Sequence, residues 1–285
     1  MADNFTIRKN WVTSFELMVK RPIIILPFFI IAFLEGLALE LIYFSTRKPI
    51  SLVMAPIIRK FSGEPFLHYP FNLVKLPKYF YYSQALIYII AGVFLIAISI
   101  NILKNIKMDL PLKAKAFIRN AANRYFSFAT FGIIMMILIF LLNKLDAFLF
   151  SKLVNFSLRH LPQIIPKFYS FGFVLFSFFT NIIMQAFLVL ALPIIVIKKK
   201  SLLKAIAGGI AMGFRNFFGI FTLIFLPFMV YLPIMLLRAY SSDLAGRMFP
   251  EISVCIMGAG IVVAIFVECF VVVCAAQFLL EKESK

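Results

Sequence analysis

Long apolar runs dominate the pattern of hydrophobic and polar positions along this chain. A helix that crosses about 30 Å of hydrocarbon needs roughly 20 predominantly apolar residues, so runs of this length are typical of transmembrane helices. Six such runs lie at about 22–45, 81–103, 126–143, 169–197, 217–237 and 252–280. The pattern therefore predicts an all-α, polytopic membrane protein with six transmembrane helices.

The segments between these runs are of two kinds. Three stretches carry apolar residues at helical spacing with basic residues between them, at 5–20, 111–125 and 201–216. Each predicts an amphipathic interfacial helix that lies on the membrane surface. The remaining segments are rich in polar residues and proline and are expected to be loops, at 46–80, 144–168 and 238–251.

The order of amphipathic stretch, span, loop and span occurs three times. Arg21, Arg124 and Arg215 stand at equivalent points, just before the first span of each unit. This periodic order indicates three helical-hairpin repeats rather than an inverted two-fold repeat. No polar stretch is long enough to form a separate soluble core. We therefore expect one integral membrane domain, 1–285, with units at about 1–105, 106–198 and 199–285.

The charge balance indicates the surroundings. The chain has 29 Lys and Arg against 12 Asp and Glu, a net charge of +17. The basic residues flank the spans, so anionic inner-leaflet lipids are the expected partners, with other membrane protein subunits as a further possibility and no nucleic acid. The residues expected to contact anionic lipid are Lys20, Arg21, Arg119, Arg124, Lys204 and Arg215.

The distribution of basic residues also predicts an orientation. Seventeen flank the side that holds both termini and 12 flank the other side. By the positive-inside rule both termini are expected to be cytoplasmic. Low acidic content with abundant Phe, Ile and Lys suits an AT-rich bacterial genome, so the expected location is the bacterial cytoplasmic (inner) membrane.

Polar residues within the spans are the candidate functional groups. Carboxylates in hydrocarbon are costly and often mark function. At about 1.5 Å per residue, Glu35, Gln185 and Glu268 each lie roughly 20 Å from the cytoplasmic end, and Asn181 lies one turn further out. One hypothesis is that these four residues form one polar layer, if their helices touch, and that this layer binds a cation, a proton or a headgroup. The alternative is that the carboxyl groups only hydrogen-bond between helices.

Two further features accompany this layer. Gly260 and Ala264 share a helix face with Glu268 and form a small-residue pair that predicts close helix packing. Glu40 lies near the outer end of the first span and is expected to reach the interface. The three cysteines all fall in the last span without CxxC spacing, so a metal site is not expected.

The sequence holds no catalytic motif. HExxH, GxSxG and the phosphate-binding loop are all absent, so we expect no enzymatic activity, no catalytic residues and no cofactor.

Three stretches carry a resemblance to a known family. They are 14–22, 191–206 and 214–220, which read SFELMVKRP, ALPIIVIKKKSLLKAI and FRNFFGI. They resemble the bacterial multi-pass family of the membrane domain of glycerophosphoryl diester phosphodiesterase and of YciC-like and DUF975-like proteins. The resemblance implies a six-helix membrane protein. No phosphodiesterase domain is present, so neither hydrolase activity nor catalytic residues carry over.

Two functional hypotheses follow. The first is a non-enzymatic membrane protein, either a scaffold or a lipid-interacting subunit of a membrane assembly, favoured by the repeated surface helices. The alternative is a transporter or channel for a small solute or lipid that uses buried Glu35 and Glu268.

Overall fold

The computed structural model describes residues 2–69, 71–158, 165–241, 244 and 249–283. Every regular element in this described part is helical, which confirms the all-α fold class. Five helices are long and apolar enough to cross a membrane, namely Leu26–Thr46, Leu76–Lys107, Tyr125–Leu153, Phe171–Ile197 and Ile252–Lys282. A sixth candidate exists if a pair of helices bent by 96°, Leu202–Arg215 and Phe217–Met229, forms one span. The chain is therefore a multi-pass membrane protein.

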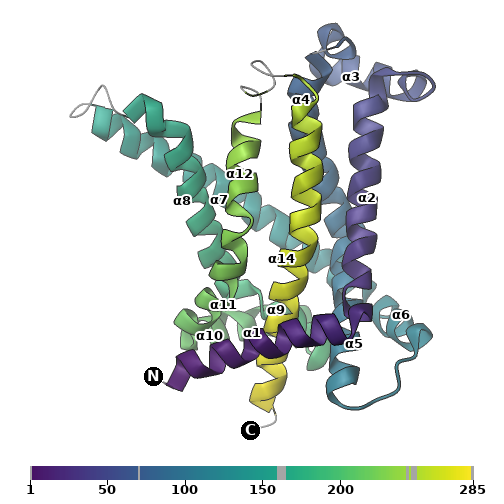
Figure 1. Ribbon diagram of the computed structural model, residues 1–285, viewed down its shortest axis with the longest axis vertical. Coiled ribbons are helices and arrows are strands. Elements are labelled where there is room, and N and C mark those ends of the chain that lie inside the picture. Colours follow the sequence, from purple (N-terminus) through teal and green to yellow (C-terminus); the bar gives the residue numbers. More distant parts are fainter. Residues whose placement is uncertain (1, 70, 159–164, 242–243, 245–248, 284–285) are drawn as a thin grey trace.

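The long helices form one bundle around the last of them (Figure 1). Its members are α2 (Leu26–Tyr43), α4 (Phe71–Ile87), α5 (Val93–Lys107), α7 (Tyr125–Leu158), α8 (Ile165–Leu188), α9 (Ala191–Ile197), α11 (Phe217–Met229), α12 (Leu232–Ala239) and α14 (Ile252–Glu283). Helix α14 contacts α2, α4 and α5 on one side and α11 and α12 on another. It is thus the central element of the bundle.

The three predicted amphipathic stretches form helices at one end of the bundle. They are α1 (Ala2–Lys20), α6 (Ala114–Ala122) and α10 (Leu202–Arg215), and both chain termini lie at this same end (Figure 1). We call it the terminal end. Helix α1 runs across the lower part of α14 in this view. The opposite end carries α3 (Ser51–Ser62) and the short helices η2 (Phe44–Thr46) and η3 (Glu64–Leu67). The surface helices therefore share one side with the termini.

Buried polar side chains fix α1 to α14. The Ser14 hydroxyl lies within donating distance of Oδ1 of Asn10 at 3.2 Å and of Oε1 of Gln277 at 3.1 Å. Nδ2 of Asn10 donates to the Cys274 carbonyl at 3.3 Å. Asn10, Ser14 and Gln277 are each no more than 1% exposed. Because an unpaired buried polar group costs about 1–3 kcal/mol, this network specifies where α1 docks.

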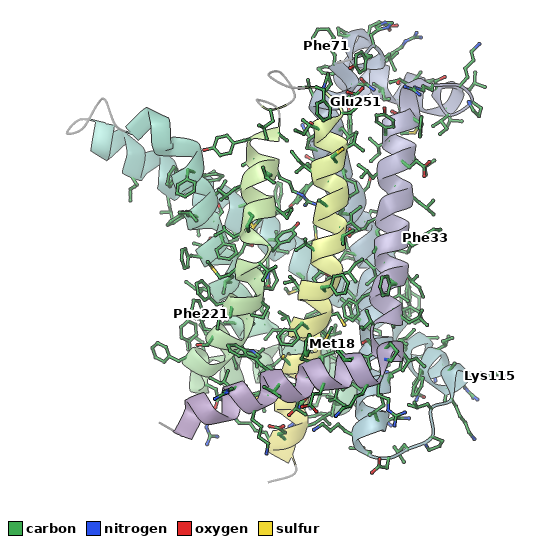
Figure 2. The ribbon with its side chains drawn as sticks, in the orientation of Figure 1. Met18, Phe33, Phe71, Lys115, Phe221 and Glu251 are labelled. Carbon is green, nitrogen blue, oxygen red and sulfur yellow. The ribbon has the colours of Figure 1, made fainter. Side chains whose placement is uncertain are left out.

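The outer faces of the bundle are apolar. Phe33 on α2 is 65% exposed, and Figure 2 shows it projecting away from the other helices. Large apolar side chains are likewise exposed along α7, including Ile133, Ile137 and Phe140. A helix that is hydrophobic all round belongs in a large core or in a membrane. These faces therefore fit contact with lipid chains.

Two predicted boundaries are wrong by more than a turn. Helix α7 continues to Leu158, so most of the predicted loop at 144–168 is helical where it is described, while 159–164 lie outside the described residues. Lys144 and Lys152 lie over the rings of Phe140 and Phe148 at 4.7 and 5.6 Å, so both ammonium groups are accommodated on a helix. The second span begins at Leu76 rather than 81, with Pro77 inside α4.

Two predicted spans are interrupted. The run at 217–237 forms α11 and α12, separated at Val230–Tyr231 between two prolines, Pro227 and Pro233. Neither helix alone is long enough to cross a membrane, so the helices of span length among the described residues number five rather than six. Together they run beside α14 (Figure 1). The run at 169–197 is divided at Val189–Leu190 into α8 and α9.

A glycine contact between α10 and α8 gives a stability prediction. A Cβ at Gly213 would lie 2.9 Å from Cα of Phe187 and 3.1 Å from the Ala186 carbonyl oxygen, and backbone does not yield easily. We expect Gly213→Ala to lower the midpoint of thermal unfolding in detergent by several degrees, since overpacking costs about 1–3 kcal/mol. Gly36→Ala, where a Cβ would meet nothing within 4 Å, is the control and should leave the midpoint unchanged or raise it. Equal midpoints for both variants would contradict the close α8–α10 contact.

Candidate intramembrane binding site

A cavity of about 360 Å³ lies inside the bundle. Its walls come from α2, α4, α5, α7, α8, α9, α11, α12 and α14, and most of the lining side chains are apolar. The polar groups that face it are Glu35, Tyr81, Gln84, Tyr88, Gln185, Tyr231, Arg238 and Glu268. Carboxyl and guanidinium groups from three different helices, α2, α12 and α14, therefore converge on one space.

Glu35 and its amide partner form the best-defined part of the site. Nε2 of Gln84 donates to Oε2 of Glu35 at 2.8 Å, across the packed pair α4 and α2. Arg238 is close enough to attract the Glu35 carboxylate electrostatically. One oxygen of Glu35 is thus held in place by an amide hydrogen bond, and a cation from α12 attracts the carboxylate.

Glu268 faces the same cavity from the middle of α14. Glu35 and Glu268 interact electrostatically and repel each other when both are ionised. Gln185 also lies on the wall, as does Ala264 one turn before Glu268. Asn181 does not line the cavity, and its Nδ2 donates to the Ser177 carbonyl at 2.7 Å. The structure therefore brings together three of the four residues of the predicted polar layer.

Arg238 is the functional candidate that the sequence prediction missed. It was assigned to the loop at 238–251, but it lies on α12 and lines the cavity. Its guanidinium is 5.8 Å from the centre of the Tyr231 ring. Nε and Nη2 are buried and have no hydrogen-bond partner among the described residues. An arginine preceded by the apolar run Leu232–Leu237 is the signal that could have identified it.

Gly260 makes room for this guanidinium. A Cβ at Gly260 would contact Nη2 of Arg238 and lie 2.9 Å from its Cζ. The sequence pattern suggested close helix packing for Gly260, whereas its closest neighbour here is a cation. Gly260 is eight residues into α14, about 12 Å below its first residue. Arg238 is therefore well inside the bundle and not in a surface loop.

Irregular backbone also gathers at the cavity. The helix from α4 to α5 contains a π-helical turn, η4 (Tyr88–Gly92), and the spans that include Val189 and Tyr231 are broken at these residues. Tyr88, Val189 and Tyr231 all line the cavity. Non-helical backbone at membrane depth is tolerated where protein buries it or where it lines a cavity, and π-turns are frequent at functional sites.

A further carboxylate lies on a membrane helix away from the cavity. Asp146 fell in the predicted loop, but it lies on α7 and is only 1% exposed. Oγ1 of Thr180 donates to its Oδ2 at 2.7 Å, and its Oδ1 is buried with no hydrogen-bond partner in the described part of the chain. Glu40, by contrast, is exposed on α2. Within the described ranges no cluster of His, Cys, Asp or Glu is suited to a metal ion.

The basic residues expected to contact lipid differ in their surroundings. Arg21, Arg119, Lys204 and Arg215 are exposed at the terminal end, and Lys20 is exposed and pairs with Glu16 at 2.9 Å. Arg124 is half-buried instead. Its Nη1 donates to the Ile195 carbonyl at 3.2 Å and its Nη2 to the Lys199 carbonyl at 3.1 Å. Arg124 therefore binds the carboxyl end of α9.

The contact between Gly260 and Arg238 is testable. We expect Gly260→Ala to push the guanidinium aside and to lower the thermal midpoint in detergent, while Gly258→Ala, with nothing within 4 Å of a Cβ, should not. In an Arg238→Ala background the effect of Gly260→Ala should fall by at least half, because the two residues are in contact and their effects are coupled. Full additivity of the two substitutions would show that they act separately.

Comparison with protein-family models, with curated proteins and with solved structures finds no match to this chain. The resemblance described above therefore stays a prediction, and the function is argued from the geometry of the site.

Proposed function

We propose that the protein is a carrier, which binds a small solute or a lipid headgroup in the central cavity and moves it across the membrane. The observation that carries this proposal is the meeting of Glu35, Arg238 and Glu268, from three separate helices, in one space inside an apolar bundle. Ionisable residues inside a membrane protein are costly and are typical of substrate or ion pathways. If these side chains were purely structural, hydrogen-bonded pairs between helices would be enough and no cavity would be needed.

The charges favour one class of ligand. Two carboxylates and one guanidinium leave the site with one negative charge when all three are ionised. A cationic group near Glu35 and Glu268 would lower the repulsion between them. The free donors Nε and Nη2 of Arg238 would suit an anionic or carbonyl group on the same ligand. With both carboxyl groups ionised, the preferred ligand is therefore a cation or a zwitterion.

The size of the cavity limits the ligand further. Small-molecule sites range over about 300–1,000 Å³, so a cavity of about 360 Å³ lies at the small end. This volume suits a small solute or a lipid headgroup.

The broken helices supply the movement that a carrier needs. Transporters commonly bind substrate at discontinuous helices and expose the site by rocking or gating one part against another. Here α12 lies beyond the break at Val230–Tyr231 and carries Arg238. A small rotation at that break would move the guanidinium relative to Glu35 and Glu268, which lie on uninterrupted helices.

A flux assay in proteoliposomes tests the proposal. The probes are labelled choline as a cation, labelled betaine as a zwitterion, labelled acetate as an anion, and fluorescent phosphatidylethanolamine for headgroup passage. We expect the parent protein to move at least one cationic or zwitterionic probe. Glu268→Gln and Glu35→Gln should each lower that rate at least tenfold, because each removes a charge that faces the ligand.

Glu40→Gln is the matched control. It makes the same chemical change one and a half turns from Glu35 on the same helix, but Glu40 is exposed and does not line the cavity. The control should keep the parent rate. Movement of none of the probes, or equal losses in the Glu35 and Glu40 variants, would overturn the carrier proposal.

A second candidate, a lipid-interacting scaffold, is favoured by a different observation. Exposed basic residues on the surface helices gather at the terminal end, with Arg119 on α6 and Lys204 and Arg215 on α10. We infer that this end faces the cytoplasm of a bacterium, because the sequence segments expected on its side carry 17 basic residues against 12 in those of the other side, or 11 without Arg238. These side chains would then meet anionic headgroups.

Charge removal tests this second candidate. The triple variant Arg119→Gln, Lys204→Gln and Arg215→Gln should retain at least threefold less phosphatidylglycerol after detergent washing than the parent, since each basic residue near an anionic surface contributes about 1 kcal/mol. The control replaces Arg59 and Lys60, which are exposed on α3 at the opposite end. Equal lipid retention in both variants and the parent would contradict the scaffold candidate.

A further inference from the structure

A second cavity, of about 340 Å³, lies at the terminal end. It is enclosed by the end of α5, by α6, by the start of α7 and by the end of α9. It shares no lining residue with the central cavity. An argument about this pocket is therefore independent of the carrier proposal.

The pocket is strongly basic. Lys104, Arg124 and Lys199 line it together with asparagines that include Asn120 and Asn123, and no carboxylate is among its lining residues. The asparagine amides supply neutral donors beside the three cations. Such a set suits a small, multiply charged anion better than a cation or an apolar ligand.

The two inner cations are held in place by backbone carbonyls. Nζ of Lys104 donates to the Ile197 carbonyl at 3.1 Å, and Arg124 donates to the carbonyls of Ile195 and Lys199. These bonds satisfy carbonyl groups at the carboxyl end of α9. The negative end of the helix dipole there would otherwise repel an anion. An ammonium has three donors and a guanidinium has five, so both groups retain donors for a ligand. Lys104 and Arg124 are thus held in position before a ligand binds, and each has N–H donors left to bind it.

Lys199 lies just beyond the carboxyl end of α9. Its φ is +52°, in the left-handed region. This conformation is common at the position after a helix end, where it turns the chain back over the last carbonyl groups. Here it accompanies a carbonyl that accepts from Arg124 and a side chain that lines the pocket.

We propose that this pocket binds a phosphate group, either the phosphodiester of an anionic phospholipid or a free phosphate. Bidentate guanidinium contact and lysine charge are the usual means by which proteins hold phosphate. The pocket lies beside the surface helix α6, at the end of the bundle where lipid headgroups would be. One headgroup would bind in this pocket at a defined site. The exposed basic residues, in contrast, would attract many anionic lipids without binding any one of them specifically.

The test compares two neighbouring charge reversals. Lys199→Glu changes a residue that lines the pocket, and Lys200→Glu makes the same charge change on an exposed residue that does not. Delipidated protein is titrated with phosphatidylglycerol and examined by native mass spectrometry. We expect one lipid adduct to survive high collision energy in the parent and in Lys200→Glu, and to fall at least fivefold in Lys199→Glu.

A second variant separates binding from misfolding. Asn123→Asp is isosteric and exposed, and it places a carboxylate on the pocket wall. It should lower the same adduct at least threefold while the thermal midpoint of the lipid-free protein stays within a degree of the parent. Equal adducts in the parent, Lys199→Glu and Asn123→Asp would overturn the proposal, as would equal losses in Lys199→Glu and Lys200→Glu.

A separate arm distinguishes the source of the phosphate. Inorganic phosphate, compared with chloride at equal ionic strength, should raise the thermal midpoint of the parent and of Lys200→Glu if the pocket takes the free anion. A resistant phosphatidylglycerol adduct without this shift assigns the pocket to lipid. Absence of both effects in the parent would refute the phosphate site, whatever the outcome of the flux assay on the central cavity.

Discussion

A polar group inside a hydrocarbon layer must find its partner within the protein, and the rest of this structure depends on that constraint. The backbone meets it by forming helices over most of the described part of the chain. Side chains meet it by local pairing, as in the amide of Gln84 on Glu35 or the cations of Lys104 and Arg124 on the carbonyls of α9. Arg238 and Asp146 each have buried polar atoms without a hydrogen-bond partner. Such atoms call for an explanation, and a bound ligand is one.

The spans were predictable because their signal is composition over a long window, which single residues hardly alter. The depth of a residue along its helix was also predictable, because every residue adds the same rise. Counting residues from the charged ends put Glu35, Gln185 and Glu268 at one depth, and all three line the cavity. The count could not tell which helix faces turn inward, so Asn181 was included although it bonds its own helix.

The positions of helix ends could not be predicted from the sequence, and the residues near them were placed wrongly for this reason. Arg238 and Asp146 were assigned to loops because a charge was taken to end an apolar run, whereas α12 and α7 both continue through them. The break at Val230–Tyr231 was equally hidden, because prolines also occur inside intact helices here, as Pro77 does in α4. Residues that match in the repeated order can also differ in their surroundings. Arg124 is half-buried and bonds α9, whereas Arg21 and Arg215 are exposed.

The docking of α1 on α14 has a consequence for how the protein is made. Asn10 and Ser14 are translated well before their partners at Cys274 and Gln277. Helix α1 therefore cannot dock until all the helices between it and α14 have been made, and its polar side chains must stay at the membrane surface until then. A chain cut anywhere between the two helices would leave Asn10 and Ser14 without these partners.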